Sequence, residues 1–167
     1  MTIIRKFFFA TLLVSLMSAC SVSQAHVLDG AKEWNGHYYK IFQMQMTWND
    51  AKSFCESMGG HLATAETQAE NEMLKTLVVK GANGQGKYYW IGGYETNQGI
   101  WKWITGKTIA DYFDWIDNRS SFSGENGKQK IRMYSSRDGK WDAGVTSWHY
   151  EFICEWENAN NAHESNM

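Results

Sequence analysis

Residues 47–63 read TWNDAKSFCESMGGHLA, the pattern of a short amphipathic helix that carries a cysteine. Thr47 and Asp50 form a start like a capping box, with Asp in place of the usual Glu or Gln. The apolar residues that follow share one helical face, namely Trp48, Ala51, Phe54, Cys55 and Met58. Gly59 and Gly60 then end the helix, because glycine readily adopts the left-handed conformation found there.

A second helix is predicted from Thr67, where Glu70 follows three residues later as in another capping box. The residues expected to form its apolar stripe are Ala69, Met73, Leu74, Leu77 and Val78. Such a stripe indicates that this helix also packs on the core of the protein.

The pattern changes to β-strands in the rest of the chain. Asp138 and Gly139 lie between two strand-like runs and favour a hairpin there. Two early helices followed by a mostly antiparallel sheet indicate the α+β class. Strands are predicted from composition and alternation at residues 37–42, 88–91, 101–104, 131–134, 140–141 and 150–156.

Four motifs in this order resemble the C-type lectin domain: the helix with Cys55, WIG at 90–92, GKWD at 139–142 and FICE at 152–155. The resemblance covers residues 33–157. It implies a C-type lectin-like fold with a long loop at about residues 105–130. It also implies a disulfide between Cys55 and Cys154, which joins the first helix to the last strand.

The N-terminal segment has the pattern of an export signal. Two basic residues precede the mostly apolar run 7–17, which is too short to span a bilayer. Small residues before Cys20 look like a bacterial lipobox, so we predict a signal peptide at 1–19, lipidation of Cys20 and a tether at 20–32. Cleavage after Ala25 is the alternative, and it removes Cys20.

Both cleavage positions leave Cys55 and Cys154 as an even pair, which indicates an oxidising compartment outside the cytoplasm. We therefore expect an exported protein of the bacterial cell envelope. With the lipid at Cys20 it is an outer-membrane or cell-surface lipoprotein, and with cleavage after Ala25 it is periplasmic or secreted.

Charge and motif content exclude several function classes. The chain has 167 residues and a formal net charge of −2, with no basic patch, so nucleic acid is not an expected partner. Membrane attachment is expected only through a lipid at Cys20, and residues 158–167 are expected to form a flexible tail. His37, His61 and His149 lack metal-ligand spacing among themselves. With no nucleophile or phosphate-loop motif either, we predict that the chain is not an enzyme.

The long loop is where the resemblance implies calcium and sugar binding. Family lectins take calcium oxygens from a Glu-Pro-Asn or Gln-Pro-Asp triplet and from an Asn-Asp pair after the late tryptophan. This chain has no proline, and Arg119 stands inside the aligned triplet 118–120. Ala143 replaces the second residue of the pair, and Lys130 and Thr146 stand about where the cysteines of a second family disulfide would be. The sequence therefore predicts a degenerate calcium site.

Oxygen-bearing side chains nevertheless remain around the loop. The predicted ligand-binding residues are Asp117, Asn118, Glu125, Asn126, Asp142 and Trp148. The sequence establishes no cofactor, and weakly bound calcium is the one candidate. Its candidate ligands are Asp142, Glu125 and Glu155.

Trp148 lies in the loop before the last strand, where an exposed ring can stack on the apolar face of a sugar. We predict a non-enzymatic extracytoplasmic recognition module that binds carbohydrate through the long-loop face. The alternative is a protein-binding adhesin or scaffold domain without sugar or calcium binding. The expected partner is accordingly a glycan or a cell-surface protein.

Overall fold

A computed structural model describes residues 26–118 and 129–163 of the chain. The predicted signal peptide and three predicted functional residues, Cys20, Glu125 and Asn126, lie outside these ranges. In the described residues, no helix is long and apolar enough to cross a membrane.

Both predicted helices are confirmed, together with their N-caps. Helix α2 (Trp48–Ser57) begins after Thr47, whose hydroxyl accepts a hydrogen bond from the Asp50 amide at 3.2 Å. Helix α3 (Gln68–Ala82) begins after Thr67, which accepts from the Glu70 amide at 3.2 Å. A side-chain cap at each start satisfies an amide that has no partner inside the helix.

The buried face of α3 is more polar than its sequence indicated. Leu74 and Val78 are fully buried as expected, but Ala69 is exposed. Glu70 and Asn71 are buried in its place. The buried face is therefore rotated at the start of the helix, where these two side chains hydrogen-bond to distant segments.

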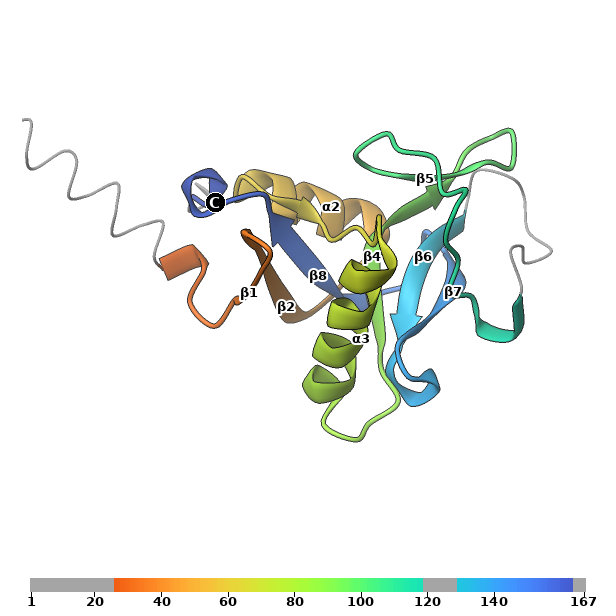
Figure 1. Ribbon diagram of the computed structural model, residues 1–167, viewed down its shortest axis with the longest axis horizontal. Coiled ribbons are helices and arrows are strands. Elements are labelled where there is room, and N and C mark those ends of the chain that lie inside the picture. Colours follow the sequence, from red (N-terminus) through yellow and green to blue (C-terminus); the bar gives the residue numbers. More distant parts are fainter. Residues whose placement is uncertain (1–25, 119–128, 164–167) are drawn as a thin grey trace, which may run out of the picture.

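In the part of the chain that the structure describes, eight strands form one sheet in the order β1-β2-β8-β4-β6-β7, with β3 paired to β8 and β5 paired to β4. The β4–β8 pair is parallel and the other pairs are antiparallel. The predicted α+β class with a mostly antiparallel sheet is thereby confirmed (Figure 1). The strands are β1 (Lys32–Trp34), β2 (His37–Met46), β3 (His61–Leu62), β4 (Tyr88–Glu95), β5 (Trp101–Trp103), β6 (Gln129–Tyr134), β7 (Lys140–Val145) and β8 (Tyr150–Trp156).

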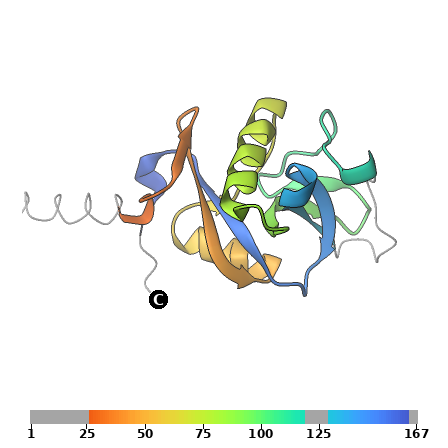
Figure 2. The ribbon, with the colours of Figure 1, turned by 90° about the horizontal axis from the view of Figure 1, so that it is seen from below.

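The sheet carries a hydrophobic core on each face. Successive side chains of a strand point to opposite faces, so Tyr89 and Ile91 enter the core that includes residues of α3, while Trp90 enters the core that includes residues of α2. Figure 2 shows the two helices on opposite sides of β8. Side chains on the two faces of the sheet consequently face different surroundings.

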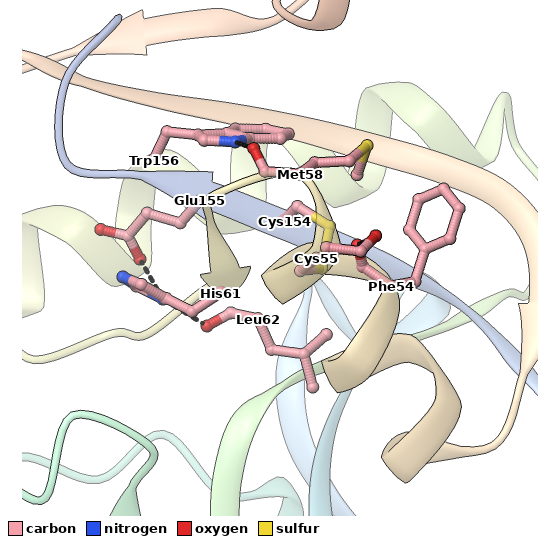
Figure 3. Close-up of a disulfide and its surroundings, with 9 residues drawn as sticks. Phe54, Cys55, Met58, His61, Leu62, Cys154, Glu155 and Trp156 are labelled. Atoms are coloured by element: carbon pink, nitrogen blue, oxygen red, sulfur yellow. Dashed lines mark hydrogen bonds and ion pairs between the residues drawn. A yellow bond between two sulfur atoms is a disulfide. The ribbon is translucent and has the colours of Figure 1, made fainter. Parts of the chain in front are cut away.

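A disulfide joins α2 to β8, as the resemblance implied. Cys55 and Cys154 are bonded, with their Cα atoms 5.4 Å apart, and both are fully buried (Figure 3). The bridge fixes the first helix to a strand at the middle of the sheet.

Parts of the expected tether and tail contact the core in the described residues. Ala162, in the expected flexible tail, is fully buried in the α2-side core. The amide of His163 donates to the carbonyl of Met58 at 3.0 Å. In the expected tether, Val27 is buried, and β1 begins at Lys32. These short segments pack through a few small contacts that overall composition does not reveal.

Candidate functional site

The predicted ligand residue Asp142 lies in a buried ion pair. Strands β6 and β7 place it directly opposite Arg132. The Nε and Nη2 atoms of Arg132 lie 3.0 Å and 2.5 Å from Asp142 Oδ2. Both residues are buried, so the carboxylate already has a cation of the chain beside it. A positive neighbour at that distance opposes the approach of a second cation.

Aromatic rings surround the guanidinium of Arg132. Its central carbon lies 3.8 Å from the ring centroid of Tyr88, 4.6 Å from that of Trp148 and 5.0 Å from that of Tyr150. Arg132 also donates a hydrogen bond to the Tyr150 hydroxyl. These distances are typical of cation–π contacts. The guanidinium of the buried ion pair therefore contacts all three rings.

Trp148 is the most exposed member of this group, with 43% of its surface accessible. Tyr134 extends the group by stacking on Tyr88, with ring centroids 4.2 Å apart. We name Tyr88, Tyr134, Trp148 and Tyr150 the aromatic patch. Burial raises the pKa of Tyr88 and of Tyr150, so their hydroxyls stay protonated and can donate hydrogen bonds at neutral pH.

The segment that contains Asp117 and Asn118 lies beside strand β7. Both residues belong to the short 3₁₀ helix η1 (Ile116–Asn118), and the Trp141 amide donates to the Asp114 carbonyl at 2.8 Å. Asp117 is exposed, with a φ of 55°. The fold thus brings this segment next to the strand of Asp142, and the ligand roles of Asp117 and Asn118 stay predictions.

Lys130, about where the resemblance implies a cysteine, is buried against aromatic rings instead. Its Nζ lies 4.8 Å from the ring centroid of Trp48 and 5.3 Å from that of Tyr94. Burial lowers the pKa of Lys130. These three residues line a hollow of about 250 Å³ together with Lys52 and Ile104.

Glu155, the third candidate calcium ligand, lies on the opposite face of the sheet from Arg132. It is 1% exposed. Its Oε2 accepts a hydrogen bond from the Thr64 amide at 2.9 Å, and its Oε1 lies 3.2 Å from the Tyr39 hydroxyl. The same hydroxyl donates to Glu70 at 2.8 Å. The hydrogen bonds fix the buried carboxylate in one orientation.

Two histidines complete the surroundings of Glu155. Nδ1 of His37 lies 2.8 Å from Glu155 Oε1, and Nδ1 of His61 lies 3.9 Å from Glu155 Oε2. Glu157 contacts both rings, at 3.4 Å from His37 Nε2 and 3.0 Å from His61 Nε2. Across residues 26–118 and 129–163, the group of His, Cys, Asp and Glu side chains with the spacing to hold a metal ion is His37, Glu155 and Glu157.

The carboxylates raise the pKa of both histidines. For His37 the largest cause is its hydrogen bond to Glu155. For His61 burial acts in the opposite direction, but the charge of Glu155 and the hydrogen bonds to Leu62 and Glu157 outweigh it. Burial and the charge of Glu155 together raise the pKa of Glu70. The protonation of His37, His61 and Glu70 therefore depends in each case on the charge of Glu155.

Sequence spacing missed this group because its members come from three separate strands. The usable signal was the short spacing of the two acids: Glu157 follows Glu155 by two residues, just past the end of β8, and both carboxylates contact His37. Strand pairing, which the sequence did not predict, then supplies the two histidines.

Known proteins resemble this chain in both sequence and fold. The lectin C-type domain matches residues 44–156. One chain of the snaclec coagulation factor IX/factor X-binding protein of Trimeresurus stejnegeri is 28% identical over 149 residues, which is 86% of this chain and 93% of that relative.

Two solved structures have a similar fold. Human lithostathine has a TM-score of 0.67 at 25% identity, over 78% of this chain and 90% of its own. The carbohydrate-recognition domain of the mouse scavenger receptor C-type lectin has a TM-score of 0.66 at 25% identity, over 77% and 95% of the two chains. Domains of this kind are generally recognition modules rather than enzymes. With its confirmed disulfide and sheet, the chain belongs to the C-type lectin domain family.

Proposed function

We propose that this chain is a non-enzymatic recognition module that binds carbohydrate through the aromatic patch and does so without calcium. The observation that carries the proposal is the exposed Trp148 ring held over the guanidinium of Arg132. An aromatic face suits the apolar face of a pyranose ring. The tyrosine hydroxyls of the patch supply hydrogen bonds for the hydroxyl groups of a sugar.

The calcium site of the family is degenerate in this proposal. Calcium binds about six to eight oxygens, while Asp142 is paired with Arg132 and Ala143 offers no side-chain oxygen. Oxygens of Asp117, Asn118, Glu125 and Asn126 remain the predicted source of any residual affinity. We expect that affinity to be weak, at ~10⁻⁴–10⁻³ M as in extracellular calcium modules.

A glycan array tests the proposal when it is run with calcium and with chelator. Wild-type protein should bind the same glycans in both buffers, and Trp148→Ala should lose that binding while its circular dichroism stays unchanged. Phe113→Ala is the matched control, because Phe113 is an aromatic residue outside the patch with 50% of its surface exposed. Binding that disappears with chelator would instead support a rebuilt calcium site.

Protein recognition is the second candidate function. The name of the snaclec relative describes binding to coagulation factors IX and X, which supports a protein partner for a domain of this fold. A folded protein that binds no glycan on the array would overturn carbohydrate recognition. In that case an adhesin or scaffold that contacts a cell-surface protein through the same patch would be favoured.

The proposed location is the bacterial cell envelope, with the protein anchored through a lipid on Cys20. The Cys55–Cys154 disulfide supports an oxidising compartment. One acyl chain binds membranes only marginally, so stable anchoring relies on the several chains of a bacterial lipoprotein. Cys20→Ser should release the protein from the membrane fraction. A mature N-terminus at His26 would instead mean a periplasmic or secreted protein.

A further inference from the structure

We infer that His37, Glu155 and Glu157 form a binding site for a divalent transition-metal ion of the zinc type, with the ring of His61 beside them. The site goes beyond the proposed carbohydrate function and does not depend on it. It lies on the α3 face of the sheet, while Arg132 and the aromatic patch lie on the α2 face.

Strand pairing brings the four side chains to one place. Strand β8 lies between β2 and β3, with Glu155 opposite Tyr39 on one side and opposite His61 on the other. His37 precedes Tyr39 by two residues on β2 and so points to the same face. Glu157 lies just beyond β8 and contacts the rings of His37 and His61. The cluster is thus a consequence of register rather than of chance surface proximity.

The distances suit a shared metal ion. Zinc bonds of about 2.0–2.1 Å in a tetrahedron place neighbouring ligand atoms about 3.3 Å apart. Nδ1 of His37 lies 2.8 Å from Glu155 Oε1, and Nε2 of His61 lies 3.0 Å from Glu157 Oε1. Both distances lie within about 0.5 Å of that separation. His37, Glu155 and Glu157 each offer one ligand atom within 4.8 Å of the others, so small side-chain shifts would place these three around one ion.

Hydrogen bonds outside the cluster already orient two of its side chains. Nδ1 of His61 lies 2.9 Å from the Leu62 carbonyl (Figure 3). A carbonyl oxygen only accepts, so Nδ1 carries the proton, and Nε2 lies 3.0 Å from Glu157. A bond from the second ring nitrogen to a carbonyl or carboxylate is the usual support of a metal-binding histidine. Glu155 is similarly fixed by the amide of Thr64.

The donor set determines the class of metal. Calcium and magnesium prefer oxygen ligands throughout, whereas imidazole nitrogen suits zinc, copper, iron and nickel. The imidazole of His37, with that of His61 beside it, therefore favours a transition metal. A divalent ion would also balance the two negative charges of Glu155 and Glu157 when the histidines are neutral.

The cluster is open to solvent on one side. The side chains of Glu157 and His37 are 50% and 32% exposed, while those of His61 and Glu155 are 20% and 2% exposed. An ion can thus enter past Glu157 and reach the fixed, buried carboxylate of Glu155.

Isothermal titration of the purified protein with ZnCl₂ tests the site, with and without an excess of calcium. We expect one zinc ion per chain, with an affinity that calcium does not change. His37→Gln/His61→Gln should lose the binding. His149→Gln/His163→Gln, which removes two exposed imidazoles elsewhere, is the matched control and should bind as the wild type does.

Glu157→Gln provides a second test if the histidine variants fold poorly. Because Glu157 is half exposed, this change should leave the fold intact. We expect zinc affinity to fall by at least about 10-fold, because even a changed hydrogen-bond partner of a metal ligand costs about 10–100-fold, with unchanged circular dichroism. Zinc should also raise the Tm of the wild type but not that of the His37→Gln/His61→Gln variant. The inference is overturned if wild-type protein binds no zinc, if both histidine pairs affect binding equally, or if excess calcium displaces the zinc.

Discussion

The ion pair between Arg132 and Asp142 should be among the most costly interactions to disturb in this domain. Only 7% and 10% of the two side chains are exposed, so removing one partner leaves the other charge buried. That situation costs about 3–5 kcal/mol. We therefore expect Arg132→Met to lower the free energy of unfolding by this amount. Asp142→Asn should cost a similar amount, about 3–5 kcal/mol, because it leaves the buried Arg132 guanidinium without its counter-charge.

The double variant Arg132→Met/Asp142→Asn isolates the interaction energy between the two side chains. It leaves no buried charge, so its cost should fall below the sum of the single costs by about 2 kcal/mol, within the range for contacting residues. Urea denaturation of the four proteins, followed by circular dichroism, measures this coupling, and equal m-values would show that the unfolded states are comparable.

The same cycle on Lys52→Met and Glu56→Gln is the matched control, since this pair is 36% and 48% exposed. Exposed i,i+4 pairs couple by only about 0.3–0.5 kcal/mol. If the Arg132–Asp142 coupling is no larger than this control, burial does not strengthen the ion pair, and the reasoning fails.

Three further stability predictions concern other parts of the fold, each measured by urea denaturation. Cys55→Ala/Cys154→Ala removes a cross-link with a sequence separation of 99 and should cost about 4.7 kcal/mol in the chain-entropy model; a loss below about 1 kcal/mol would contradict that model here. Tyr39→Phe removes the hydroxyl between two buried carboxylates and should cost about 1–3 kcal/mol, whereas an unchanged midpoint would show that the hydroxyl is dispensable. Thr67→Ala should cost about 1 kcal/mol by removing the α3 cap, while Thr76→Ala, on the exposed surface of the same helix, should have no such cost.

Local patterns in the sequence predicted the parts of the fold that depend on neighbouring residues. Thr47 and Thr67 cap their helices as expected, because a cap needs only a hydroxyl next to free amides. The bond between Cys55 and Cys154 followed from the order of motifs that resemble a known family. These features need no knowledge of how distant segments pair.

Distant partners explain what local patterns did not predict. Asn71 is buried because its Oδ1 accepts a hydrogen bond from the indole of Trp141 at 2.7 Å, across 70 residues of sequence. Helical periodicity gave no reason to bury an amide, so it placed Ala69 inward instead. The pairing of Arg132 with Asp142 has the same origin, because it depends on the register of β6 and β7. The sequence marked Asp142 as a ligand residue but could not identify its partner.

The position of β8 in the sheet has a consequence for how the domain forms. This strand pairs with β2, β3 and β4, yet it is the last strand in the described sequence. The helices can form early from local contacts, but the sheet stays in separate pieces until residues 150–156 are available. Topologies with such long-range pairings fold slowly. A chain that is exported from its N-terminal end would thus cross a translocation channel before its native sheet can close, and the disulfide would form only afterwards.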